Sequence, residues 1–292
     1  MVPLAENAPA ADRGSAPLTV QRTIILSLLL VLAALAWALL LWQGASADLD
    51  MAMSSPTMGL RGPLFLTIWV VMMAAMMFPA AAPMILTFHQ VQGAKRRRGQ
   101  AFVSTWVFVA GYMMVWTWAG IAAYAGAQTA EGVAERIALS PIIAARIGGA
   151  LFIAAGLYQL TPLKDVCLSK CRTPITFIMT SWREGTAGAF HMGVAHGGYC
   201  LGCCWLLFVI LFPLGIMNIA AMALLTLVVF AEKVLPWGRF TSRAIAVALV
   251  TYGIAVIAMP EILPIFSSGG GMDMPMNMPM PEGATPPAAS SR

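Results

Sequence analysis

About seven stretches of this chain stay apolar for roughly 20 residues each, which is the length that a helix needs to cross the hydrocarbon core of a bilayer. Hydrophobic residues make up 60% of the 292 positions and charged residues only 10%. A chain with so many long apolar runs cannot be an ordinary water-soluble domain. We therefore predict an all-α fold, a polytopic transmembrane bundle of about seven helices.

The predicted helices are separated by short segments that carry the charge. They lie near residues 22–43, 64–87, 101–126, 141–160, 190–212, 214–232 and 242–264. Most Lys and Arg residues, among them the run from Lys95 to Arg98, fall on one side of these helices. The positive-inside rule then places the N-terminus in the cytoplasm and the C-terminus outside. Topology explains the net charge of +5, so we predict no nucleic-acid partner.

The two ends of the chain differ in composition from the predicted transmembrane domain at 22–266. Residues 1–21 and 267–292 are rich in Ala, Pro, Ser and Gly, and we predict that both are disordered. The outer tail alternates methionine with other residues at positions 272, 274, 276, 278 and 280. A second outer segment carries Met51, Met53 and Met58. Flexible thioethers of this kind bind soft cations such as Cu(I), although low-complexity drift gives the same pattern.

Methionine is also frequent in the second predicted helix. Its five methionines are Met72, Met73, Met76, Met77 and Met84. A rotation of about 100° per residue places Met73, Met77 and Met84 within roughly 40° of one another, with Met76 beside them. Taken alone, this stripe favours helix packing, because an unbranched thioether fills gaps in a core.

The stretch "HMGVAHGGYCLGCCW" places imidazole and thiol groups within a helix bound for lipid. Measured from His196, helical rotation sets Cys200 at about +40°, Cys203 at about −20° and Cys204 at about +80°. These side chains therefore share one face. A lone buried cysteine is usually structural, but a cluster of such groups in hydrocarbon indicates a metal or redox site.

A second pair of cysteines lies in the predicted cytoplasmic segment "CLSKC". Cys167 and Cys171 are four residues apart, so a helix would put both thiols on one face, suited to two-coordinate binding of a soft metal. The alternative, two unremarkable reduced thiols, is equally compatible with the sequence. Further along, we interpret Glu232 and Lys233 as an ion pair at the membrane interface.

These motifs resemble those of a bacterial family of predicted metal-binding integral membrane proteins, classed as a domain of unknown function. The resemblance covers about residues 60–260 and rests on "MMAAMMFPAAAPM", "TPLKDVCLSKCRTP", "HMGVAHGGYCLGCCW" and "MNIAAMALLTLVVFAEK". It implies a bacterial inner (cytoplasmic) membrane protein and metal binding, without a reaction. The ligands that it implies are Met72, Met73, Met76, Met77, His196, Cys200, Cys203, Cys204, Cys167 and Cys171. Members of that family have a histidine where this chain has Lys170, which weakens the loop as a metal site.

The residues support several functions. The first is a copper-binding membrane protein for transport or homeostasis, with Cu(I) as its first choice among soft metals. Its partners would be the bilayer, the metal ion, and a metallochaperone or a membrane partner subunit. The alternatives are a thiol-disulfide oxidoreductase using Cys200 and Cys203, a metal-dependent oxidase, and an assembly subunit of a membrane metalloenzyme. The sequence does not decide whether the protein is an enzyme, and it favours a binding role.

Overall fold

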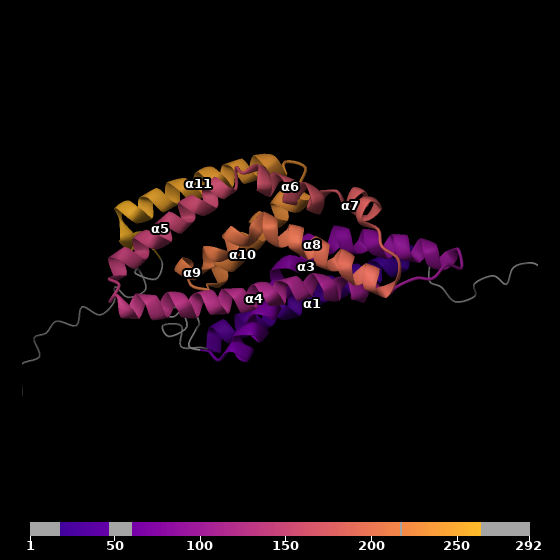
Figure 1. Ribbon diagram of the computed structural model, residues 1–292, viewed down its shortest axis with the longest axis horizontal. Helices are drawn as coiled ribbons and strands as arrows, with labels where there is room; N and C mark the ends of the chain where they lie inside the picture. The colour runs from indigo at the N-terminus through magenta and orange to yellow at the C-terminus, as the bar shows by residue number, and fades with distance from the viewer. Residues whose placement is uncertain (1–17, 47–59, 217, 264–292) are drawn as a thin grey trace, which may run out of the picture.

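The computed structural model describes residues 18–46, 60–216 and 218–263, and within these ranges the chain forms helices and no strand (Figure 1). The all-α prediction is therefore confirmed. The methionines of the outer tail and of the segment around Met51 and Met53 lie outside the described residues, as do most of the residues that we predict to be disordered.

Within the described ranges, six helices are long and apolar enough to cross a membrane. They are α1 (Leu18–Ser46), α3 (Gly62–Arg97), α4 (Thr105–Arg136), α5 (Pro141–Tyr158), α8 (Gly185–Val209), which continues through α9 (Leu211–Leu214), and α11 (Gly238–Ala258). The shorter elements are α6 (Pro162–Arg172), α7 (Pro174–Ser181), α10 (Ile219–Val234) and a 3-10 turn at Pro260–Ile262.

The expected helix over 214–232 is shorter than a full span, so the part of the chain that the structure describes has six long helices rather than about seven. The chain turns at Gly215, whose φ of 89° is in the left-handed region that glycine adopts without a steric penalty. Helix α10 begins only after Asn218, whose side chain accepts a hydrogen bond from the Ala221 amide and caps the helix. The result is a helix of 16 residues.

Glycines set the closest helix contacts. A Cβ atom at Gly111 would lie 2.2 Å from the carbonyl oxygen of Phe190, and one at Gly193 would lie 2.1 Å from that of Phe108. Helices α4 and α8 can therefore cross in backbone contact only because both positions lack a side chain. Gly149 and Gly253 play the same part between α5 and α11.

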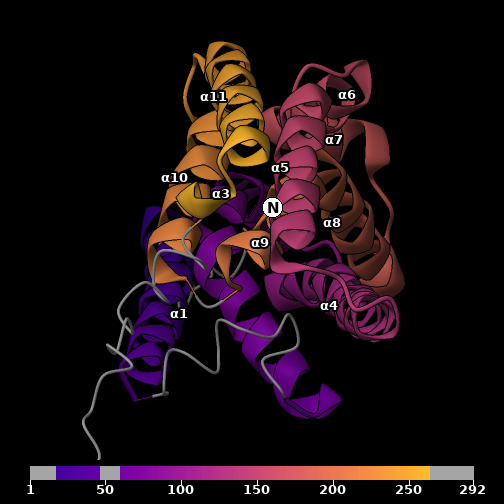
Figure 2. The ribbon, with the colours of Figure 1, turned by 90° about the vertical axis from the view of Figure 1, so that its left-hand side faces the viewer.

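The helices are arranged in two flanks about a central group. Helices α5 and α11 lie side by side along one flank, and α1 lies on the other flank against α3 (Figure 2). Helix α8 packs along α4 and also contacts α6. This contact between α6 and α8 is where the cysteines meet.

Candidate metal centre

Helix α8 buries one face that carries four of the predicted ligands. His196, Cys200, Cys203 and Cys204 each expose no more than 2% of their surface. All four project from the middle of a helix that is covered by α4 and α6. The structure therefore places these polar and soft side chains inside the bundle.

Helix α6 brings the other two cysteines to the same place. Cys167 Sγ lies 2.8 Å from the position that a Cβ atom of Gly202 would take, and the Cys171 thiol interacts with the sulfurs of Cys200 and Cys203. All five cysteines are free thiols and buried. The sequence placed Cys167 and Cys171 in a separate cytoplasmic segment, whereas the folded chain gathers all five thiols between α6 and α8.

The sulfur of Cys200 contacts two polar side chains from other helices. Lys233 on α10 donates to it from 2.8 Å, and the Tyr112 hydroxyl of α4 lies 3.1 Å away. An ammonium group can only donate a hydrogen bond, so Cys200 Sγ is the acceptor, as a thiolate would be.

The interpretation of Glu232 and Lys233 as a pair with each other is wrong. Glu232 pairs instead with Lys164 of α6, at 2.8 Å from Nζ to Oε2, while Lys233 points to Cys200. Adjacent helix residues are about 100° apart and cannot face each other, so the two charges serve different partners. Neither lies at an exposed interface, since both are buried.

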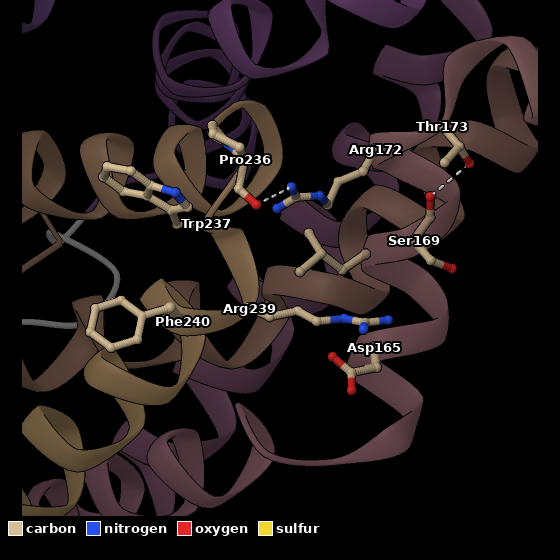
Figure 3. A pocket seen from close by; sticks show the side chains of 9 residues that line it. Asp165, Ser169, Arg172, Thr173, Pro236, Trp237, Arg239 and Phe240 are labelled. Atoms are coloured by element: carbon tan, nitrogen blue, oxygen red, sulfur yellow. Dashed lines mark hydrogen bonds between the residues drawn. The ribbon is translucent and has the colours of Figure 1, made fainter.

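Ion pairing and carbonyl contacts hold α6 against the end of α10. The Lys164–Glu232 pair ties the start of α6 to α10. At the other end of α6, Arg172 donates to the carbonyl oxygens of Glu232, Leu235 and Pro236. Arg172 and Pro236 both line a pocket of about 360 Å³, and Figure 3 shows the hydrogen bond between them. These contacts fix the position from which Cys167 and Cys171 reach α8.

His196 lies among aromatic rings and has no polar partner. Its ring centroid is 5.9 Å from that of Phe108, 5.5 Å from Tyr112 and 5.7 Å from Phe177. Neither ring nitrogen has a hydrogen-bond partner among the described residues. A buried nitrogen without a partner is costly, so the ring is available to a ligand.

The predicted methionine ligands are buried on α3. Met72, Met73, Met76 and Met77 expose at most 1% of their surface and belong to the same core cluster as the cysteines. Helix α3 packs along α1 and α4 and also contacts α10 and α7. The structure therefore buries the thioethers near the bundle centre but does not pair α3 closely with α8.

The cluster fits a soft metal of low coordination number. As they stand, the described residues hold no group of three His, Cys, Asp or Glu side chains placed to bind a metal. The thiols of Cys203 and Cys204 instead donate to the Cys200 carbonyl oxygen, at 3.0 and 2.9 Å. A two-coordinate site needs only two sulfurs, and soft thiolates select Cu(I). The donor set is therefore suited to Cu(I), with a rotation of the thiols on binding.

The surroundings of α6 oppose ionisation of its two cysteines. Burial raises the pKa of the Cys167 thiol, and hydrogen bonds to the sulfurs of Cys200 and Cys203 raise that of Cys171 well above its usual range. Metals bind thiolates, so a metal that binds at α6 must displace these protons.

Sequence reasoning did not identify Tyr112 and Lys233 as part of this site. Lys233 had a usable signal, because its neighbour Glu232 points in another direction on any helix. Tyr112 gave none, since a tyrosine in an apolar helix is common and its contact with Cys200 depends on how α4 crosses α8.

A protein-family profile described as PpoB2, copper chaperone, matches residues 66–256 of the chain. The matched region includes α4 to α10 with all five cysteines, and the α3 methionines. No curated protein and no solved structure shows significant similarity to the chain.

Proposed function

Because the chain belongs to the PpoB2 family of copper chaperones, we propose that it is an integral membrane protein that binds copper as Cu(I) and acts in copper transport or homeostasis. Copper is the cargo in this proposal rather than a resident cofactor. The cysteines between α6 and α8 form the main binding site. A metallochaperone or a membrane subunit that receives the metal is the partner that such a role requires.

The convergence of all five cysteines carries the proposal. Thiols from α6 and α8 meet in one buried cluster. Lys233 donates a hydrogen bond into this cluster, and His196 on the same face of α8 has two ring nitrogens without a hydrogen-bond partner among the described residues. Ionisable and soft side chains are costly inside an apolar bundle, which makes such a cluster a functional site by default. Among the common biological metals, Cu(I) is the one that thiolates and thioethers select together.

The donors suggest a path for the metal. The thioethers of Met72, Met73, Met76 and Met77 are weaker donors than thiolates and lie on a different helix from the cysteines. We propose that they bind Cu(I) transiently on its way to the cysteines of α8. Cys167 and Cys171 on α6 then form the side of the site that faces the cytoplasm.

Copper loading of the purified full chain tests the proposal. The chain is reduced, loaded with Cu(I), and analysed for copper content and for alkylation of each cysteine. We expect Cys200 and Cys203 to be protected until a strong soft-metal chelator is added. The Cys200→Ser, Cys203→Ser double variant should bind little copper. Its melting temperature should fall, because the sulfur that accepts from buried Lys233 is lost, so copper is measured at a temperature where the variant is still folded. Full copper content in that variant would refute the cysteine site.

The same measurement separates copper binding from thiol-disulfide exchange. The contact between Lys233 and Cys200 favours a reactive thiolate, which an oxidoreductase would also need. A disulfide is released by a reductant and is indifferent to a chelator. Protection that only a reductant removes would therefore favour the oxidoreductase.

A further inference from the structure

Three charged side chains are buried where α6 and α8 meet α10. Lys164 and Glu232 compensate each other, since their side chains expose 1% and 2% of their surface and lie 2.8 Å apart. Lys233 has no carboxylate partner among the described residues. Its Nζ atom donates instead to the sulfur of Cys200.

The compensation for Lys233 has to come from sulfur. An isolated ammonium group in an apolar environment is costly unless an anion lies next to it. The sulfurs of Cys171, Cys200, Cys203 and Cys204 all lie close enough to interact with it electrostatically. The charge of the cysteine cluster is therefore tied to the single positive charge of Lys233.

We propose that Lys233 is a specificity-determining residue, which makes the cysteine site selective for a monovalent soft cation over a divalent one. The inference rests on the proposed function in one respect, that the cargo is bound by cysteine thiolates. Two thiolates with a monovalent cation keep one negative charge, and the ammonium of Lys233 cancels it. Two thiolates with a divalent cation are already neutral, so Lys233 would be left as an uncompensated buried charge.

The geometry favours a site with two sulfurs. No three His, Cys, Asp or Glu side chains among the described residues are placed to share a metal, so the arrangement favours two ligands over a larger set. Cys203 lies one helical turn away on the same buried face and can turn its thiol from the Cys200 carbonyl toward a metal. A single charge has a large effect here, because electrostatic interactions are strong where water is excluded.

Metal competition on the purified full chain tests this inference. Ag(I) serves as a monovalent probe that does not change oxidation state, and Cd(II) serves as the divalent probe. Both affinities are measured against chelators of known strength. Lys233→Met nearly keeps the side-chain length and removes the charge, so the ratio of Ag(I) to Cd(II) affinity should fall by at least about tenfold.

Two further variants show whether the charge itself is responsible. Lys233→Arg keeps a positive charge and should hold the affinity ratio within about threefold of the wild type. Lys170→Met removes the same charge from α6 outside the buried cluster and should leave the ratio unchanged. If Lys233→Met does not fold, Lys233→Arg still decides, because a tenfold fall in that variant would overturn the role of the charge.

The outcomes separate this inference from the proposed function. An unchanged ratio in a folded Lys233→Met variant that still binds Ag(I) overturns the selectivity role and leaves cysteine binding intact. A wild-type chain that binds neither Ag(I) nor Cu(I) at its cysteines refutes the proposed function itself.

Discussion

At the scale of single residues, Cys200 is contacted by a lysine, a tyrosine and two further cysteines. Its sulfur accepts from Lys233 and lies beside the Tyr112 hydroxyl. The Cys203 and Cys204 thiols turn back to its carbonyl oxygen. Charge, hydrogen bonding and sulfur chemistry therefore converge on one residue of α8.

Much of the α8 face could be predicted from the sequence, because helical periodicity alone relates His196 to Cys200 and Cys203. The contribution of α6 could not. Whether Cys171 meets Cys200 depends on how a short helix folds back against the bundle, which no local pattern encodes. For Lys233 the local pattern indicates only that Glu232 is not its partner, and the partner itself lies 33 positions away in the sequence.

A double substitution tests whether the α3 methionines do more than pack. Met73→Leu with Met77→Leu nearly conserves volume, so each change should cost under about 1.5 kcal/mol in free energy of unfolding. The polarisable sulfur is lost. If these thioethers pass Cu(I) to the cysteines, the variant should fold and lose copper-dependent uptake in cells or proteoliposomes.

Substitution of Met113 and Met114 by Leu provides the control for the α3 methionines. Both residues lie on α4, so this change removes the same number of thioethers without altering α3. Equal uptake by the wild type and both variants would show that α3 uses methionine for packing alone.

At the scale of elements, α6 is the helix whose position decides whether the five cysteines form one cluster. Its N-terminus is capped by Thr161, whose hydroxyl accepts from the Lys164 amide, and Pro162 occupies the first turn. These local signals predict a helix at 162–172. They do not predict its burial, which depends on Glu232 and on the carbonyls that Arg172 reaches.

Gly238 allows Arg172 to hold α6 in place. A Cβ atom at Gly238 would lie 1.6 Å from Arg172 Nη1 and 2.2 Å from the Glu232 carbonyl oxygen. Gly238→Ala should therefore displace Arg172 and destabilise the fold by about 2 kcal/mol. We expect a lower melting temperature and faster alkylation of Cys167 and Cys171 in the metal-free chain.

Gly132→Ala is the matched control for Gly238. Gly132 lies within α4, and a Cβ atom there would meet nothing within 4 Å. Alanine has the higher helix propensity, so this change should be neutral or stabilise by up to about 1 kcal/mol. Equal alkylation rates in the two variants would contradict the role given to Gly238.

At the scale of the whole molecule, one end of the bundle gathers the basic side chains. Helix α3 ends at Lys95, Arg96 and Arg97, and Lys95 pairs with Glu184 just before α8 begins. That pairing also keeps the pKa of the exposed Glu184 carboxyl below its usual value. The C-terminal end of α3 and the start of α8 therefore lie together, on the side of the bundle that we predict to face the cytoplasm.

The short helix α10 returns the chain from the side where α9 ends to the side where α11 begins. Gln21 and Arg96 line one pocket, so α1 begins at the basic end where α3 stops. Arg172 reaches Leu235 from α6, so α11 starts on the side of α6 and runs away from it. The 16 residues of α10 extend about 24 Å at 1.5 Å per residue, enough to return the chain across most of a hydrocarbon core.

Reporter fusions test this topology. A reporter that is active only outside the cytoplasm should give no signal after Arg98, at the basic end, and a signal after Arg136, where α4 ends on the opposite side. After Arg292 it should also give a signal, because α10 carries the chain back before α11 crosses again. A signal after Arg98 and none after Arg136 would reverse the whole orientation. A signal after Arg136 with none after Arg292 would show instead that α10 enters the membrane without crossing it. In that case the C-terminal methionines would face the cytoplasm and could not collect copper from outside.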